Sequence, residues 1–205
     1  MNDDIVPVPD DLWQEANEYT SRGNFDKAIE IYKYILIRYG ANNLANEFAN
    51  ARLAGILYML GQTELAEDHI RKALNYNPEN PDYHCTLGTI YYTRFEWKKA
   101  VKEYRVALEK EPWNGEYLRA LGEAVFNTGD KKTGLEYLHK AAPFYLDNSG
   151  FLAEMATAYI SLGDIENARL YAEKAVATRP DDIMALAVLK KTYVLGSGTG
   201  NVTTS

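Results

Sequence analysis

Apolar residues recur at every third or fourth position through most of the chain, the spacing that places them on one face of an α-helix. Residues 81–114 show this pattern as two helices joined by a turn. Asn80 and Pro81 suit the start of the first helix, and Pro112 cannot continue the second. The predicted packing faces carry His84, Leu87, Gly88 and Tyr91 in the first helix and Ala100, Val101, Tyr104, Ala107 and Leu108 in the second.

The pattern returns every 34 residues. Pro78 and Pro112 are one period apart, and Pro180 follows two periods later. Small residues keep the same period at Ala66, Ala100, Gly134 and Ala168, as do turn glycines at Gly61, Gly129 and Gly163. A period of this length indicates stacked units, each covering the apolar face of the next. We therefore predict five helical hairpins, at residues 9–42, 47–80, 81–114, 115–148 and 149–182.

Three departures from the period change the local prediction. Phe95 replaces a turn glycine, so it either adopts a strained positive φ, at a cost of about 1 kcal/mol, or the turn differs. The extra residues 43–46 predict a longer turn or a longer helix. Pro143 predicts a helix end near Ala142, leaving residues 144–146 as an apolar linker that packs under the next hairpin.

The two ends fall outside the five hairpins. Residues 1–8 are acidic and contain Ile5-Val6-Pro7-Val8, which predicts an extended segment. Residues 183–195 predict one further helix that covers the open end of the stack. Its side chains Ile183, Leu186, Val188 and Leu189 are expected to pack on the fifth hairpin. Residues 196–205 predict a flexible tail.

The spacing Leu87-Gly88-x2-Tyr91, Ala100-x3-Tyr104-x2-Ala107 and Pro112 resembles the tetratricopeptide repeat. The resemblance covers about nine tenths of the chain when the last helix is included. It implies an all-α fold, a right-handed α-solenoid of five helix-turn-helix units plus a C-terminal capping helix, with about eleven helices. It also implies that the first helix of each unit lines a concave groove.

Family groove positions transfer to several side chains of this sequence. The resemblance implies a partner-binding groove that includes Trp13, Asn17, Arg52, Tyr58, Met59, Asp82, Tyr92, Arg119, Glu123, Phe126 and Asn127. Tyr58, Tyr92 and Phe126 form, with Ile160, a ladder of large side chains at one repeat position. Two interpretations are open: they pack between helices, or their edges contact a peptide. Arg119 and Glu123 are four residues apart and can also pair with each other.

A carboxylate clamp of the co-chaperone kind is not expected. Of the family's clamp residues only Asn17 has a counterpart here, with Arg52 as a changed but basic neighbour. Asp82 and Glu116 stand where basic residues are needed, and their charges would repel a carboxylate.

Composition narrows the function further. The net charge of −7 disfavours nucleic-acid binding. The longest apolar run, residues 54–60, is too short for membrane insertion. One cysteine, Cys85, and no secretory pattern favour a cytoplasmic protein. The acidic residues Glu64, Glu67 and Asp68 are interpreted as a solvated helix face.

No catalytic motif, metal-ligand spacing or cofactor motif is present in the sequence, so we predict neither an enzyme nor a bound cofactor or metal. The leading hypothesis is a non-catalytic interaction module that holds a partner peptide or helix in the groove, as an adaptor or scaffold. The alternative is a self-assembling homo-oligomeric scaffold that uses residues 1–8 and the exposed ends of the solenoid. The sequence does not identify the partner.

Overall fold

The computed structural model describes residues 7–197. Within that range the chain forms eleven α-helices, one short 3-10 helix and no strand. The chain divides into two compact units, residues 1–112 and 113–205. Residues 1–6 of the extended segment predicted at 1–8, and residues 198–205 of the tail predicted at 196–205, lie outside the described residues.

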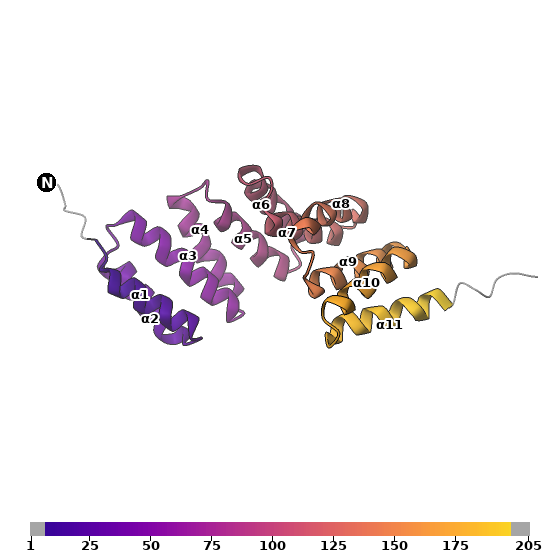
Figure 1. The fold of residues 1–205 in the computed structure, drawn as a ribbon. Helices are drawn as coiled ribbons and strands as arrows, with labels where there is room; N and C mark the ends of the chain where they lie inside the picture. Colours follow the sequence, from indigo (N-terminus) through magenta and orange to yellow (C-terminus); the bar gives the residue numbers. More distant parts are fainter. Residues whose placement is uncertain (1–6, 198–205) are drawn as a thin grey trace, which may run out of the picture. The chain divides into compact units, whose positions relative to one another are not determined.

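Unit 1 consists of three antiparallel helical hairpins, drawn from indigo to magenta in Figure 1. Its helices are α1 (Asp10–Ser21), α2 (Phe25–Arg38), α3 (Asn43–Met59), α4 (Thr63–Tyr76), α5 (Pro81–Thr93) and α6 (Trp97–Lys110). The second helix of each hairpin packs against the first helix of the next, α2 on α3 and α4 on α5. The extra residues 43–46 lengthen α3, which is one of the two predicted outcomes.

Unit 2 contains two hairpins and a final helix, drawn in orange to yellow at its end (Figure 1). Its elements are α7 (Gly115–Asn127), α8 (Lys131–Ala141), η1 (Ala142–Phe144), α9 (Ser149–Leu162), α10 (Ile165–Thr178) and α11 (Ile183–Ser197). The last helix packs on both α9 and α10, and it reaches two residues beyond the predicted end.

Asparagine caps set the starts of successive first helices. The side chains of Asn80, Asn114 and Asn148 each accept a hydrogen bond from a backbone N–H in the first turn of α5, α7 and α9. These residues are 34 positions apart, so the repeat fixes helix starts as well as packing faces.

Close helix approach depends on small residues at the predicted places. A Cβ atom on Gly88 would lie 2.7 Å from the Tyr104 ring, so α5 and α6 approach at their present distance only because no side chain intervenes. In the next hairpin, a Cβ on Gly134 would meet the backbone of Phe126 at 2.6 Å.

The linker after Pro143 follows the prediction only in part. Helix α8 ends at Ala141 as expected. Tyr145 stacks on Phe151 with ring centroids 4.8 Å apart, whereas Leu146 is 71% exposed and does not pack under the next hairpin.

The packing face of α11 also differs from the prediction. Ala185 and Thr192 are buried, and Val188 and Leu189 are partly buried. Ile183 is 79% exposed and Leu186 is 43% exposed, so these two do not cover the fifth hairpin. A different set of α11 residues faces the fifth hairpin, because the Asp182 side chain anchors the start of the helix. This side chain accepts hydrogen bonds from the Ser149 hydroxyl and from the backbone N–H of Ala185.

Candidate partner-binding groove

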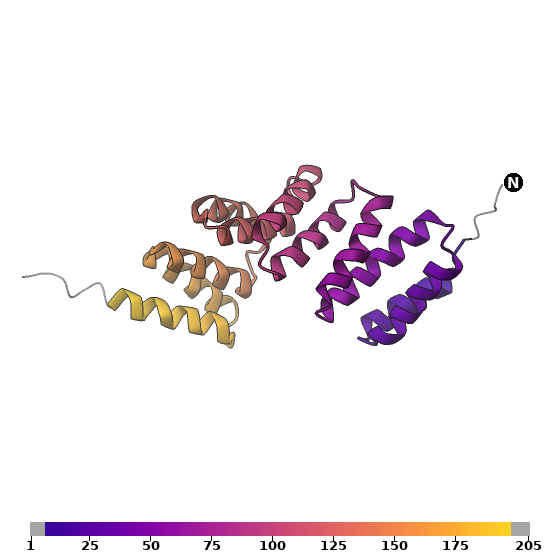
Figure 2. The same cartoon turned by 180° about the vertical axis from the view of Figure 1, so that it is seen from behind.

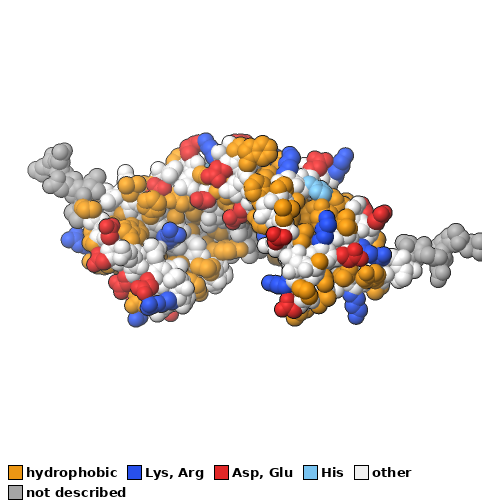
Figure 3. Space-filling model, in the orientation of Figure 1, with side chains coloured by type: hydrophobic (Ala, Val, Ile, Leu, Met, Phe, Trp, Pro, Cys, Tyr) orange, Lys and Arg blue, Asp and Glu red, His pale blue; other side chains and the backbone are white. Residues whose placement is uncertain are grey.

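A groove with a volume of about 400 Å³ lies in unit 1. It is lined mainly by the first helices of the three hairpins, α1, α3 and α5, which is where the repeat pattern places a concave surface. The lining residues are Thr20, Phe48, Ala51, Arg52, Gly55, Ile56, Met59, Ile70, Asn80, Asp82, Tyr83 and Thr86. Figure 3 shows hydrophobic side chains gathered over α3 and α5, with single charged side chains among them.

Two apolar side chains of the groove remain open to solvent. Phe48 is 49% exposed and Met59 is 57% exposed, and both are on α3. Gly55 lies between them, and a Cβ there would meet no atom within 4 Å, so the groove is open at its middle. These residues offer apolar area that the unit itself does not cover.

The groove also carries charge. Arg52 is exposed and forms no hydrogen bond or ion pair with any residue from 7 to 197, although its charge influences Tyr32 and Tyr83. Asp82 lies in the first turn of α5, where a negative charge suits the helix N-terminus. A guanidinium without an ion pair is a favourable contact for a carboxylate.

The carboxylate of Glu47 is buried next to the groove. The Tyr83 hydroxyl and the Asn77 amide both donate hydrogen bonds of 3.0 Å to Glu47 Oε1. Burial and the neighbouring Glu47 raise the pKa of Tyr83, so its hydroxyl stays protonated and keeps donating. The α3–α5 wall of the groove is therefore held by polar contacts across two hairpins.

Of the residues predicted in unit 1, Arg52, Met59 and Asp82 line this groove. Trp13 packs against Tyr32, whose hydroxyl donates to Asn17 at 2.9 Å. These two predicted residues therefore serve the packing of the first hairpin. Phe48, Asn80 and Thr86 also line the groove, and the sequence marks Phe48 only through its groove position in the repeat.

Tyr58 and Tyr92, the two members of the predicted ladder in unit 1, both contact other side chains of that unit. Tyr58 is hydrogen-bonded to Thr93 with an oxygen–oxygen distance of 3.2 Å. Tyr92 meets the edge of Trp97 with ring centroids 4.9 Å apart. Both residues are partly buried, which agrees with packing between helices.

In unit 2 the predicted residues form a charged cluster on α7 and α9. Arg119 Nε lies 2.9 Å from Glu123 Oε1 and 2.9 Å from Glu154 Oε2, so the expected pair with Glu123 is present. Glu154 was not among the predicted site residues, because its partner is 35 residues away in sequence. Phe126 is partly buried beside Lys131, and Asn127 is exposed at the end of α7.

Glu154 has an unusual protonation equilibrium. Burial and the negative charge of Glu123 raise its pKa to about 8, and Arg119 opposes that shift. Its Oε1 atom is buried without a hydrogen-bond partner among the described residues. Folding therefore favours the protonated form of the Glu154 carboxyl.

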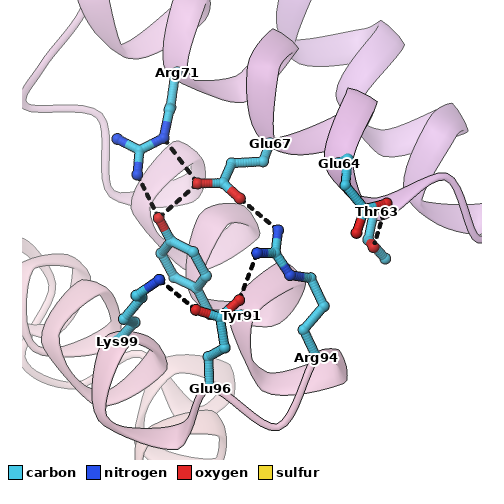
Figure 4. Close-up of polar contacts among 8 residues, drawn as sticks. All are labelled: Thr63, Glu64, Glu67, Arg71, Tyr91, Arg94, Glu96 and Lys99. Carbon is cyan, nitrogen blue, oxygen red and sulfur yellow. Dashed lines mark hydrogen bonds and ion pairs between the residues drawn. The ribbon is translucent and has the colours of Figure 1, made fainter.

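The interpretation of Glu67 as a solvated acidic residue is wrong. Figure 4 shows its carboxylate between Arg71 and Arg94, with the Tyr91 hydroxyl directed at it. Burial alone would raise the pKa of Glu67, but hydrogen bonds from Tyr91 and both arginines lower it. Arg94 also pairs with Glu96, which binds Lys99, so the cluster joins α4, α5 and α6.

Among residues 7–197 no group of three or more His, Cys, Asp or Glu side chains is arranged to hold a metal ion. Within the same range no helix has the length and apolar character needed to cross a membrane.

Comparison with known proteins agrees with this architecture. A model of the tetratricopeptide repeat matches residues 150–182, which form the fifth hairpin. No curated protein matches the sequence at a significant level.

Several solved structures share the fold. YrrB, described as a tetratricopeptide-repeat protein with an unusual peptide-binding site, has a TM-score of 0.68 and 21% identity, over 85% of this chain and 88% of its own. A MamA fragment from Desulfovibrio magneticus RS-1 has a TM-score of 0.74 and 17% identity, over 83% and 95%. A thermophilic repeat protein of the same kind from Thermus thermophilus has a TM-score of 0.68 and 15% identity, over 90% and 98%.

These findings confirm the resemblance that the sequence indicates. The chain has the all-α solenoid fold of tetratricopeptide-repeat proteins. This fold supports a protein–protein interaction module.

Proposed function

We propose that the chain is a non-catalytic adaptor or scaffold that binds an extended segment of a partner protein in the unit 1 groove. The observation that supports this is that two exposed apolar side chains, Phe48 and Met59, line one groove together with Arg52, which forms no ion pair within residues 7–197. Apolar anchors provide most binding energy at such surfaces, and a charged group provides orientation. The peptide-binding site for which YrrB is described supports the same use of the fold.

The groove predicts the chemistry of its partner. A segment with two apolar side chains and a carboxylate between them matches Phe48, Arg52 and Met59 in order along α3. In unit 2, four residues remain proposed contacts for a partner: Phe126, which is the counterpart of Tyr92, and Arg119, Glu123 and Asn127.

A peptide-display selection on the immobilised full chain tests the proposal. Enriched peptides are then titrated by fluorescence anisotropy against the wild type and the Phe48→Ala/Met59→Ala variant. We expect at least about a tenfold loss of affinity, since truncating a central anchor commonly costs more than about 1 kcal/mol.

The matched control is Ile37→Ala/Leu65→Ala. These side chains are 85% and 50% exposed in unit 1 and lie outside the groove lining. Affinity should stay unchanged in this variant, and circular dichroism should be the same for all three proteins. Equal affinity in the two double variants contradicts binding in the groove.

Self-assembly is a second candidate, and the outer face of α11 favours it. Ile183, Met184 and Val194 are 79%, 68% and 64% exposed on a helix whose charged residues are Lys190 and Lys191. The helix that ends the stack thus carries apolar residues where a terminal cap is expected to be polar. Light scattering should give a multiple of 23.2 kDa for the wild type and the monomer mass for Ile183→Ser/Val194→Ser. A monomeric wild type contradicts this candidate.

A further inference from the structure

Helix α6 carries a row of basic side chains outside the unit 1 groove. Lys98, Lys102 and Arg105 are spaced four and three residues apart, so they lie on one face of the helix and span about 10.5 Å of it. All three residues are exposed, and none of them forms a hydrogen bond or an ion pair with any residue from 7 to 197. These three residues are called the basic row below.

The charge of this helix differs from that of the chain. The whole chain has a net charge of −7, whereas α6 has five basic and two acidic residues, and one of the acids, Glu103, is bound to His84. At the repeat position of Lys98, α4 has Glu64 and α10 has Glu166, in agreement with the preference of a helix N-terminus for negative charge. Lys98 therefore opposes the helix dipole, and no ion pair offsets that effect.

Aromatic rings gather at the start of the same helix. The Trp97 ring contacts Tyr92 and Phe95, with ring centroids 4.9 Å and 5.2 Å apart. Phe95 is 75% exposed and has φ 61°, in a turn where other repeats have glycine. The chain thus holds a large apolar side chain in solvent although the backbone there is strained. Strained residues of this kind cluster at functional sites.

The positive surface is narrow. Helix α5 lies between α4 and α6, and Figure 2 shows these helices from behind. On α4, Glu64 and Asp68 are exposed at the repeat positions that Lys98 and Lys102 occupy on α6. A nucleic acid or a membrane would meet these carboxylates together with the basic row, and like charges repel. A segment about as wide as one helix meets the row alone.

We propose that the basic row and Phe95 bind a short acidic segment of a partner protein. Carboxylates of the segment pair with the row, and an apolar side chain of the segment packs on the Phe95 ring. Lysine and arginine form charge-assisted hydrogen bonds with carboxylates, and aromatic side chains are frequent anchors at interfaces. No α6 residue lines the unit 1 groove, so this is a second surface, and the chain can hold two partners at once.

The test is a peptide-display selection on the full chain carrying Phe48→Ala/Met59→Ala. This bait lacks the two apolar anchors of the groove, so that enriched peptides report other surfaces. We expect the enriched peptides to share several acidic residues beside an aromatic or aliphatic side chain. Fluorescence anisotropy of the labelled peptides should show that their affinity falls as the salt concentration rises, because exposed charge pairs are screened.

Two variants of the bait each remove one part of the surface. Lys98→Glu/Lys102→Glu reverses the row, Phe95→Gly removes the ring, and each should weaken peptide binding at least about tenfold. Neither change should impair folding, because an acid suits the helix start and glycine occupies this turn in other repeats. The matched control is Lys190→Glu/Lys191→Glu, which changes the net charge equally on exposed residues of α11 and should leave affinity unchanged. Circular dichroism should be the same for all variants.

The proposal requires both losses of affinity. A selection that enriches no acidic peptide overturns it, as does unchanged affinity in either α6-side variant or an equal loss in the α11 control. Phosphatidylserine vesicles and polyuridylate RNA are the other anionic probes. If either binds the bait more tightly than the enriched peptides and loses that binding in Lys98→Glu/Lys102→Glu, the row serves that class of partner and the proposal is wrong. Because the bait lacks the groove anchors, none of these outcomes depends on the function proposed above.

Discussion

Phe95 has φ 61°, in the turn where Gly61, Gly129 and Gly163 have φ values of 74°, 102° and 79°. The chain therefore keeps the turn geometry of the other repeats and accepts a strained residue in it. Its ring is 75% exposed and meets Trp97 edge-on at 5.2 Å, so the ring contact offsets part of the strain.

Two substitutions at this position separate strain from the ring contact. Phe95→Ala and Phe95→Gly both remove the ring, but only glycine relieves the positive φ. We expect the glycine variant to be more stable than the alanine variant by about 1 kcal/mol. Urea unfolding followed by circular dichroism measures the difference. Equal midpoints would mean that the turn relaxes in the alanine variant.

The raised pKa of Glu154 makes the stability of unit 2 depend on pH. Folding favours the protonated form, so the stabilisation is fully present below the ordinary pKa of 4.5 and is lost as pH rises toward 8. Between about pH 5 and pH 9 the free energy of unfolding should fall more in the wild type than in Glu154→Gln, by at least about 1 kcal/mol.

The control for this measurement is Glu136→Gln, which changes an exposed glutamate on α8. It should keep the wild-type dependence on pH. A Glu154→Gln variant with the full wild-type slope would show that another group titrates in this range. The sequence alone did not predict this behaviour, because the proximity of Glu123 to Glu154 depends on how α7 packs beside α9.

At the scale of elements, the Glu67 cluster links the second and third hairpins. The Glu67 carboxylate accepts a hydrogen bond of 2.9 Å from the Tyr91 hydroxyl and forms an ion pair of 2.5 Å with Arg94. Tyr91 is on α5, and Arg94 directly follows that helix. Apolar stacking of α4 on α5 is thus reinforced by a satisfied polar network at its edge.

Removing the carboxylate should weaken this junction. Glu67→Gln keeps the size but loses the charge that two arginines share, so we expect a loss of about 1–2 kcal/mol near neutral pH. Glu64→Gln, on the same helix and bonded only to neighbouring Thr63 in Figure 4, should lose almost nothing. Urea midpoints of the two variants test this, and equal losses would refute a special role for Glu67.

The hairpins were predictable because the 34-residue period places small, large and capping residues at fixed positions, as Gly88 with Tyr104 and the asparagine caps illustrate. The fifth repeat even matches a family model by itself. Two partners of Glu67, Arg94 and Tyr91, were not predictable, since they reach it only after two hairpins dock, whereas Arg71 lies four residues after Glu67 on the same helix. For the groove, the repeat register predicted Arg52, Met59 and Asp82, which line it. It did not predict that Tyr32 contacts the Trp13 ring and donates a hydrogen bond to Asn17.

At the scale of the whole molecule, a stack of hairpins is stable only when its last apolar face is covered. Leu152, Ala153 and Ala175 form a buried cluster in unit 2, and Ala185 of α11 completes it. The prediction that this helix covers the stack is therefore supported by Ala185 and Thr192 rather than by Ile183.

Ending the chain after Asp182 should open this cluster. Losing the inward side of α11 exposes apolar area on α9 and α10, and we expect a loss of about 2–4 kcal/mol in unit 2. Hydrogen exchange read by mass spectrometry should show faster exchange in α9 and α10 while α1–α4 keep their wild-type rates, because each helix contacts mainly its neighbours. Ending the chain after Ser197 keeps α11 whole and should leave every helix unchanged. Slow exchange in α9 and α10 without α11 would contradict a covering role for this helix.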